Sequence, residues 1–87
     1  MKIRIIWSAL KHIDDPKDIV HVIRNAEVVR HYCDDPFQLL YLGFDTKGRA
    51  LEVLQQINDD GDDFVFHADK ITSKFIPLLE RRYDEKR

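Results

Sequence analysis

At 87 residues, the chain is long enough for one domain and too short for a second hydrophobic core. Its 14 Lys and Arg face 16 Asp and Glu, and the net charge of −2 argues against a protein that coats nucleic acid through charge alone. No apolar run approaches the roughly 18 residues that span a membrane, the first residues lack the apolar segment of a secretory signal, and the single cysteine, Cys33, excludes an internal disulfide. The composition therefore predicts one cytoplasmic domain over residues 1–87, with no membrane as partner.

The first residues predict a short strand and one helical turn. Ile3, Ile5 and Trp7 stand two residues apart, which is the spacing along one face of a strand. Ser8 is then placed to cap a single turn of helix that ends at His12.

A longer helix is predicted to begin at Pro16. Asp15 can accept a backbone N–H as the N-cap, proline fits the first helical position, and Asp18 places negative charge in the first turn. The residues that follow predict an amphipathic helix of about three turns. Its apolar face is formed by Ile19, Val20, Ile23 and Ala26.

After Ala26 the spacing of apolar side chains changes from that of a helix to that of a strand. Three turn sequences divide this part of the chain: Asp-Asp-Pro, Asp-Thr-Lys-Gly with Gly48 where positive φ is needed, and Asn-Asp-Asp-Gly. Because a parallel crossover needs about a dozen residues, such short links predict antiparallel neighbours. The four predicted strands are residues 27–33, 37–44, 49–57 and 63–69, of which the second is mostly apolar and therefore central.

The last predicted element is a helix over residues 72–83, where apolar side chains return to helical spacing. Thr72 or Ser73 can cap it, and the regular helix is expected to start near Lys74, because Pro77 is tolerated only in the first turn. The predicted fold class is α+β, with N-terminal helices, an antiparallel four-strand meander and a C-terminal helix.

Charge is distributed unevenly along the chain. Four aspartates lie together in the turn before the fourth predicted strand, whereas the C-terminal segment is basic. Such local polarity leaves RNA binding possible at the basic end. The basic residues there are Lys70, Lys74, Arg81, Arg82, Lys86 and Arg87.

Two stretches of the chain resemble a known family. The first contains Trp7 and Lys11-His12 before the capped helix, a strand ending in Asp-Pro, and then Leu42-Gly43…Gly48-Arg49-Ala-Leu-Glu-Val. The second is His67-Ala68-Asp69-Lys70-Ile71-Thr72, followed by a helix that ends Arg81-Arg82-Tyr83. In this order and spacing, over roughly residues 7 to 83, they resemble the BrnT-like toxins of bacterial type II toxin–antitoxin modules. The second stretch is similar to the Ser-Ala-Arg-Lys-Ala-Thr segment and basic last helix of that family.

The resemblance implies the RelE/ParE-like fold, ribonuclease activity, and a cognate antitoxin protein that binds the chain and neutralises it. It also implies RNA cleavage without a metal or other cofactor: a base activates the 2′-hydroxyl, a cation stabilises the phosphorane, and an acid protonates the leaving oxygen. The residues at matching family positions, which would be catalytic, are Lys11, His12, Arg49 and Lys70. Basic residues that would bind RNA are Lys74, Arg81 and Arg82.

Arg49 and other polar residues near the family-like stretches also have a simpler interpretation. Arg49 can pair with Asp45 in its own hairpin. His67 alternates with phenylalanines and is expected to face away from their core, either as a surface residue or as an acid or base. Glu52 has the parity of the more polar sheet face and suits a salt bridge or a general base. Asp69, where the family has arginine, and the acidic balance favour a second hypothesis, a non-catalytic protein-interaction module of the same fold.

No metal site is predicted. His31 and Cys33 share a strand face, but no second pair stands at zinc-ligand spacing. The aspartate-rich turn lacks the distal glutamate of a calcium loop.

Overall fold

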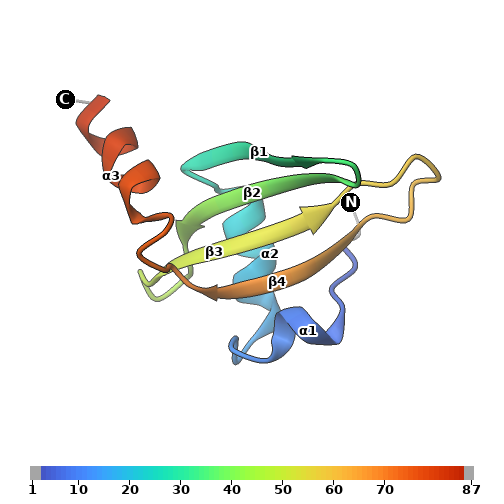
Figure 1. The fold of residues 1–87 in the computed structure, drawn as a ribbon. Helices are drawn as coiled ribbons and strands as arrows, with labels where there is room; N and C mark the ends of the chain where they lie inside the picture. The colour runs from blue at the N-terminus through green and yellow to red at the C-terminus, as the bar shows by residue number, and fades with distance from the viewer. Residues whose placement is uncertain (1–2, 86–87) are drawn as a thin grey trace.

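The computed structural model describes residues 3–85, and the side chains of residues 3–82. Two helices come first, α1 (Trp7–Leu10) and α2 (Pro16–Arg24). Then follow β1 (Val28–Asp34), β2 (Phe37–Phe44), β3 (Ala50–Gln56), β4 (Phe64–Lys70) and α3 (Ile76–Glu85). The strands form one antiparallel sheet in chain order, with α1 and α2 against one face and α3 at one end (Figure 1). The predicted α+β class and the four-strand meander are confirmed.

Each strand lies within one residue of its predicted boundaries, and β2 is an inner strand as expected. Gly48 has a φ of +80° in the turn between β2 and β3, so the prediction that this position needs glycine is confirmed. The turn between β1 and β2 contains the predicted Asp-Asp-Pro sequence, with a cis peptide bond between Asp35 and Pro36. The turn residues in the sequence thus predicted correctly where each strand of the sheet ends and the next begins.

The start of α2 is also as predicted. Asp15 accepts the backbone N–H of Lys17 at 3.0 Å, and Pro16 is the first helical residue. Asp18, expected to act only as first-turn charge, is buried and faces the sheet rather than the solvent. This burial links α2 to the hairpin between β2 and β3.

The apolar face of α2 differs from the predicted one. Val22 is fully buried beside Ile19, whereas Val20 is only half-buried. Val22 lies against Gly43 of β2, where a Cβ atom would come within 3.4 Å of Val22 Cγ1 and of Ala26 Cα. Because β2 has glycine at this point, the helix approaches the sheet closely enough to bury Val22.

The predicted N-terminal strand is wrong. Residues 3–6 form only one parallel bridge, between Ile5 and Val65 at the edge of β4. The single turn α1 is present, but its N-cap is Ile6, without a side-chain cap. Ser8 Oγ instead donates a hydrogen bond to the carbonyl oxygen of Phe66 at 2.6 Å. Since β4 is an edge strand, this hydroxyl satisfies a backbone group that has no further strand to pair with.

Both edge strands contain a β-bulge. The register shifts at Tyr32 in β1 and at Phe66 in β4, and each is an extra residue opposite the neighbouring strand. The bulge in β4 brings two successive side chains to one face: Phe66 packs beside Leu54, and His67 reaches Glu52. The prediction that His67 faces away from the phenylalanines is therefore wrong, because strict alternation fails at the bulge.

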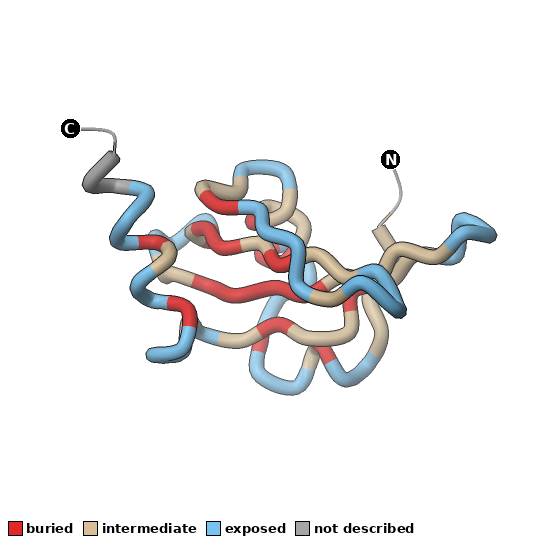
Figure 2. The backbone as a smooth tube through the Cα atoms, turned by 45° about the horizontal axis from the view of Figure 1, so that its top comes forward, coloured by how far each residue is buried: buried red, intermediate tan, exposed pale blue. Residues whose placement is uncertain are grey.

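Apolar side chains are buried on both faces of the sheet, and Figure 2 shows buried stretches in the inner strands and exposed ones in the turns. Against α1 and α2 the cluster consists of Ala9, Ile13, Ile19, Val22, Leu51, Val53, Val65 and Ala68. On the opposite face it consists of Val28, Leu40, Leu42, Leu54, Phe75 and Leu79. Among the described side chains after β4, Phe75 and Leu79 are buried in this second cluster, and Ile71 and Leu78 are partly buried against it. The segment around α3 therefore covers one end of that face.

The helix α3 begins at Ile76, two residues later than the predicted start near Lys74. In the turn before it, the N–H groups of Phe75 and Ile76 donate to the carbonyl oxygen of Thr72 at 3.0 and 3.2 Å. Pro77 consequently lies in the first helical turn, where its missing N–H needs no partner. The same turn brings the Thr72 amide next to the sheet.

Candidate functional site

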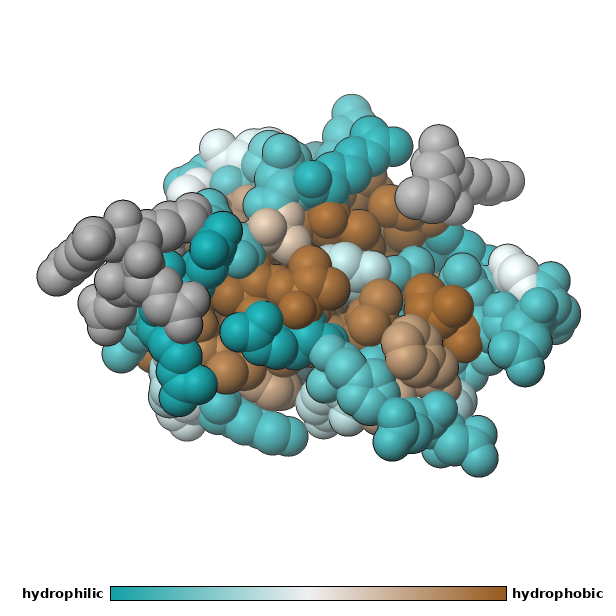
Figure 3. All heavy atoms as spheres, turned by 90° about the horizontal axis from the view of Figure 1, so that it is seen from above, coloured by the Kyte–Doolittle hydropathy of each residue, from teal (hydrophilic) through white to brown (hydrophobic). Residues whose placement is uncertain are grey.

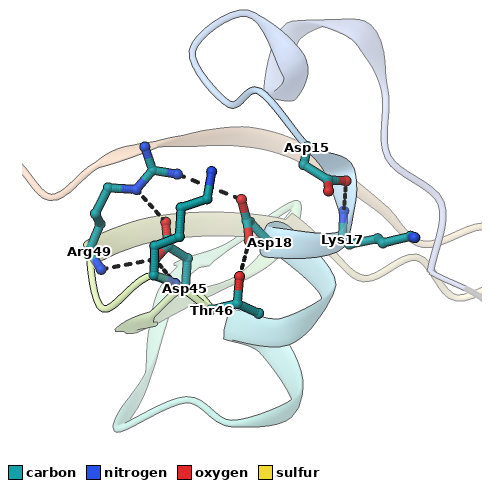
Figure 4. Close-up of polar contacts among 7 residues, drawn as sticks. Asp15, Lys17, Asp18, Asp45, Thr46 and Arg49 are labelled. Carbon is teal, nitrogen blue, oxygen red and sulfur yellow. Dashed lines mark hydrogen bonds and ion pairs between the residues drawn. The ribbon is translucent and has the colours of Figure 1, made fainter.

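The hairpin between β2 and β3 holds Arg49 on two buried carboxylates (Figure 4). Asp45 accepts the backbone N–H groups of Lys47 and Arg49 at 2.9 Å each, and the guanidinium Nε–H of Arg49 at 2.7 Å. Arg49 Nη2 lies 3.7 Å from Asp18 Oδ2, and Asp18 Oδ1 accepts the hydroxyl of Thr46 at 3.1 Å. The simpler interpretation of Arg49, as a partner of Asp45 within its own hairpin, is confirmed.

This network changes the ionisation of both partners. Burial alone would raise the pKa of Asp45, but the backbone and guanidinium N–H groups of Arg49 and the N–H of Lys47 outweigh it, so the pKa lies below its ordinary value. The hydrogen bond to Asp45, and then the charge of that carboxylate, raise the pKa of Arg49. Arg49 therefore stays charged, and its side chain is 40% exposed, which leaves part of the guanidinium accessible to an anion.

A small pocket of about 140 Å³ lies beside Arg49, and we name it the Arg49 pocket. Lys70 reaches it because the end of β4 pairs with the start of β3. The link between α1 and α2 closes it from the other side. Its lining residues are His12, Ile13, Asp14, Arg49, Leu51 and Lys70. Three of the four residues predicted to be catalytic are thus brought together from three separate parts of the chain.

A larger and more open pocket of about 590 Å³ adjoins the first, and we name it the His67 pocket. It is within the size range of pockets that hold small organic ligands. His12 lines both pockets, so they meet at that residue. The polar side chains around it come from Ser8, Lys11, His12, Glu52, His67, Thr72 and Lys74. Two predicted catalytic residues, Lys11 and His12, and one predicted RNA-binding residue, Lys74, are therefore neighbours here.

Glu52 and His67 form a pair in the His67 pocket. Glu52 is 3% exposed, and its Oε2 lies 2.8 Å from Nε2 of His67. Its Oε1 accepts the backbone N–H of Thr72 at 2.7 Å. Both oxygens of this buried carboxylate therefore have a partner, while the imidazole remains 36% exposed. A histidine held by a carboxylate in an open pocket is a candidate for proton transfer.

The sequence did not predict this pair. Glu52 and His67 were each recognised as possible acids or bases, but nothing in the strand pattern placed them together. Their meeting depends on the bulge at Phe66, which changes the face of β4 on which the imidazole lies. One feature of the sequence points to such a pair: Glu52 is an acidic residue within an inner strand that is otherwise largely apolar. A buried carboxylate there needs hydrogen-bond donors from its neighbours.

Aromatic side chains form one wall of the His67 pocket. The rings of Tyr32 and Phe75 meet edge to face with their centroids 6.2 Å apart. Lys74 Nζ lies 5.4 Å from the centroid of Tyr32 and 5.2 Å from that of Phe75, and 3.4 Å from the tyrosine hydroxyl oxygen. The wall therefore combines flat apolar surface with a positive charge.

The remaining predicted RNA-binding residues lie elsewhere. Arg81 and Arg82 are exposed on α3 and line neither pocket. The Nε–H of Arg82 donates to the carbonyl oxygen of Glu27 at 3.1 Å. At the other end of the site, Lys11 Nζ lies 5.1 Å from the ring centroid of Trp7, which is 73% exposed.

No group of three or more His, Cys, Asp or Glu side chains that could hold a metal ion is found within the described part of the chain. His31 instead pairs with Asp34, with Nε2 and Oδ1 2.8 Å apart.

None of the helices in residues 3–85 combines the length and apolar character needed to cross a membrane. Comparisons with family models, with curated proteins and with solved structures found no match to this chain. The RelE/ParE-like fold and the membership in the BrnT-like family therefore stay predictions from the sequence.

Proposed function

We propose that this chain is the toxin of a bacterial type II toxin–antitoxin module, a BrnT-like, metal-independent RNA endonuclease that acts in the cytoplasm until a cognate antitoxin binds it. The observation that carries the proposal is the gathering of residues that the resemblance assigns to catalysis and RNA binding around two pockets that meet at His12. These residues are Lys11, His12, Arg49, Lys70 and Lys74.

Charge supports an anionic ligand at this place. Four of the five residues are cations, in a protein whose net charge is −2. The lysines Lys11, Lys70 and Lys74 are exposed, so a phosphate can reach their ammonium groups. A local excess of positive charge steers phosphodiesters even when the whole molecule is slightly acidic.

The aromatic wall supports single-stranded RNA in particular. Unstacked bases bind proteins by stacking on aromatic rings, whereas bases within a duplex are already stacked. Tyr32 is 41% exposed and borders the same pocket as the lysine ammonium of Lys74. A nucleotide there would place its base on the ring and its phosphate near the cations.

The cleavage itself needs only groups of the protein and the RNA. The 2′-oxygen forms a bond to phosphorus, the bond from phosphorus to the 5′-oxygen breaks, and the products are a 2′,3′-cyclic phosphate and a 5′-hydroxyl. A base takes the 2′-proton, an acid gives a proton to the leaving oxygen, and cations stabilise the charge of the phosphorane. In this proposal His12, which lines both pockets, transfers a proton between the cations.

Induced expression and RNA cleavage by the purified protein test this function. We expect expression of the chain to arrest growth and deplete RNA, and the purified protein to cut single-stranded RNA. Lys70→Ala should relieve the arrest, because it removes an ammonium group from the Arg49 pocket while changing an exposed residue. Lys17→Ala, an exposed lysine on α2 that lines neither pocket, is the matched control and should leave the arrest unchanged.

Harmless expression together with intact RNA would rule out the nuclease and leave the second hypothesis, a non-catalytic protein-interaction module. Two observations favour that alternative. The guanidinium of Arg49 is already paired with carboxylates, which lessens its attraction for phosphate. Viewed from the side on which β1 lies, apolar residues form a band across the surface between hydrophilic ones (Figure 3). Exposed apolar residues on β1 and at the start of β2 are Val29, Tyr32 and Phe37.

A further inference from the structure

A buried carboxylate with two fixed contacts orients one imidazole in the His67 pocket. Glu52 lies on the inner strand β3, and its Oε1 is fixed by the backbone amide of Thr72 at 2.7 Å. Its Oε2 is thereby directed at Nε2 of His67, 2.8 Å away. Rotation of the carboxylate would break the contact with the Thr72 amide, so the backbone of β3 and this amide together set the direction of Oε2.

The contact with Glu52 favours one tautomer of His67. An ionised carboxylate only accepts hydrogen bonds, so we assign the proton of the neutral imidazole to Nε2, which leaves the lone pair on Nδ1. Within the described residues no hydrogen bond uses Nδ1. That nitrogen is therefore available to take a proton from a ligand in the pocket.

The other groups around the pocket are less suited to act as the base. The Ser8 hydroxyl donates to the Phe66 carbonyl, and the Tyr32 hydroxyl oxygen lies next to the ammonium of Lys74. The lysines that line the pocket, Lys11 and Lys74, are suited to attract the phosphate. The titratable groups that line the pocket with His67 are Glu52 from β3, Lys11 and His12 from the link after α1, Tyr32 from β1, and Lys74 from the segment before α3.

We propose that His67 is the general base of the RNA cleavage and that Glu52 is the positioning residue that holds it in the competent tautomer; this rests on the function proposed above. Nδ1 of His67 takes the proton of the 2′-hydroxyl as the 2′-oxygen bonds to phosphorus. The 5′-oxygen leaves with a proton from His12, whose imidazolium becomes neutral. The two histidines exchange one proton with solvent before the next turnover, and no other reactant is needed.

The experiment measures cleavage of a single-stranded RNA oligonucleotide across the neutral pH range, and binding of the same oligonucleotide with 2′-deoxy sugars, which cannot react. His67→Ala should lower kcat by about 10²- to 10⁴-fold and leave binding of the 2′-deoxy oligonucleotide unchanged. Added imidazole should restore part of the rate, because the replaced side chain is partly exposed. His21, a half-buried residue of α2, lines neither pocket, so His21→Ala should behave as the parent protein.

Glu52→Gln tests the positioning role with a side chain of the same size that still accepts a hydrogen bond. The amide can donate to Nε2 and so favours the wrong tautomer. We expect kcat to fall about 10- to 100-fold, the acidic limb of the pH profile to move, and KM to stay the same. Thermal unfolding of each variant checks that it is folded.

The outcomes separate the two proposals. A folded His67→Ala variant that cleaves RNA within a few-fold of the parent rate overturns the role of His67, while the nuclease function stands. A Glu52→Gln variant with an unchanged rate and pH profile overturns the positioning role. Loss of 2′-deoxy binding in His67→Ala would make His67 a binding residue instead of the base. If the parent protein cleaves no RNA, the proposed function fails, and the role of His67 fails with it.

Discussion

Asp45 concentrates the polar contacts of the β2–β3 hairpin on one carboxylate. Its side chain has no exposed surface, and three N–H groups of Lys47 and Arg49 donate to it. Hydrogen bonds to a charged group contribute about 1.5–3 kcal/mol each when the group is buried. The same carboxylate also positions Arg49 at the edge of the Arg49 pocket, so structure and site depend on one residue.

Removing the negative charge of Asp45 should destabilise the protein by an amount that depends on pH. For Asp45→Asn we expect the free energy of unfolding at pH 7 to fall by about 1–3 kcal/mol, because a neutral amide oxygen accepts the N–H groups less strongly. The pKa of Asp45 is lowered by folding, so its contribution is present above the unfolded-state pKa and is lost as pH falls through the folded-state value. Urea unfolding of parent and variant at neutral and at acidic pH measures this difference.

The difference between the two proteins should therefore shrink below a pH of about 4, where carboxyl groups ordinarily titrate. Asp59→Asn, an exposed aspartate in the turn before β4, is the control and should change stability little at either pH. An equal loss for Asp45→Asn at neutral and acidic pH would show that packing, and not the charge, is what Asp45 contributes.

The two β-bulges shape the His67 pocket at the level of the strands. The bulge in β4 brings Phe66 and His67 to one face, and the bulge in β1 is at Tyr32, whose ring borders the pocket. An extra residue bends an edge strand and re-aims a side chain, so two edge strands converge on one pocket across the width of the sheet. One inner strand, β3, supplies the floor of the pocket through Glu52 and Leu54.

Removing the ring of Tyr32 should weaken RNA binding more than catalysis. Stacking of a base on an aromatic side chain contributes about 1–3 kcal/mol, so Tyr32→Ala should raise the dissociation constant for single-stranded 2′-deoxy RNA analogues by about 5- to 150-fold. Tyr32→Phe keeps the ring and should bind as the parent does. Fluorescence anisotropy with a labelled oligonucleotide measures these constants.

Phe37→Ala is the matched control for the tyrosine variant. Phe37 is 43% exposed, similar to Tyr32, but it lines neither the His67 pocket nor the Arg49 pocket. Equal weakening of binding by the two alanine variants would mean that exposed aromatic surface in general, rather than this wall, contacts the RNA.

For the molecule as a whole, the net charge and the placement of the charges lead to opposite expectations for RNA binding. A net charge of −2 predicts weak attraction for RNA, whereas three exposed lysines and Arg49 lie around the adjoining pockets. The salt dependence of binding distinguishes these expectations, because it counts the phosphates that cations neutralise and ignores charge elsewhere.

Binding of single-stranded RNA should weaken with salt in proportion to the number of cations engaged. With three or four phosphate contacts, the slope of log K against log salt concentration should lie between about −2 and −3, since each contact contributes about −0.7. Lys70→Ala should reduce its magnitude by about 0.7, and Lys17→Ala should leave it unchanged. A slope near zero for the parent protein would contradict phosphate binding at these pockets.

Much of the fold was predictable from the sequence because local chemistry decided it. Asp15 and Pro16 start α2, Gly48 closes a hairpin, and the strands end where the turn residues stand. The predicted strand at the start of the chain was wrong because residues 3–6 bond to the edge of β4 at only one bridge. Val22 was missed on the buried face of α2 because its burial depends on Gly43, a residue of another element.

The sequence by itself determined the α+β order and the antiparallel meander, since these follow from short-range spacing and composition. The candidate site residues came from the family resemblance. Only the tertiary structure decided which of them meet. It placed His12, Arg49 and Lys70 around one pocket, and it left Arg81 and Arg82 outside both. It also paired Glu52 with His67, because a one-residue bulge in an edge strand reverses the face of every side chain beyond it. No local pattern in the sequence marks where that bulge falls.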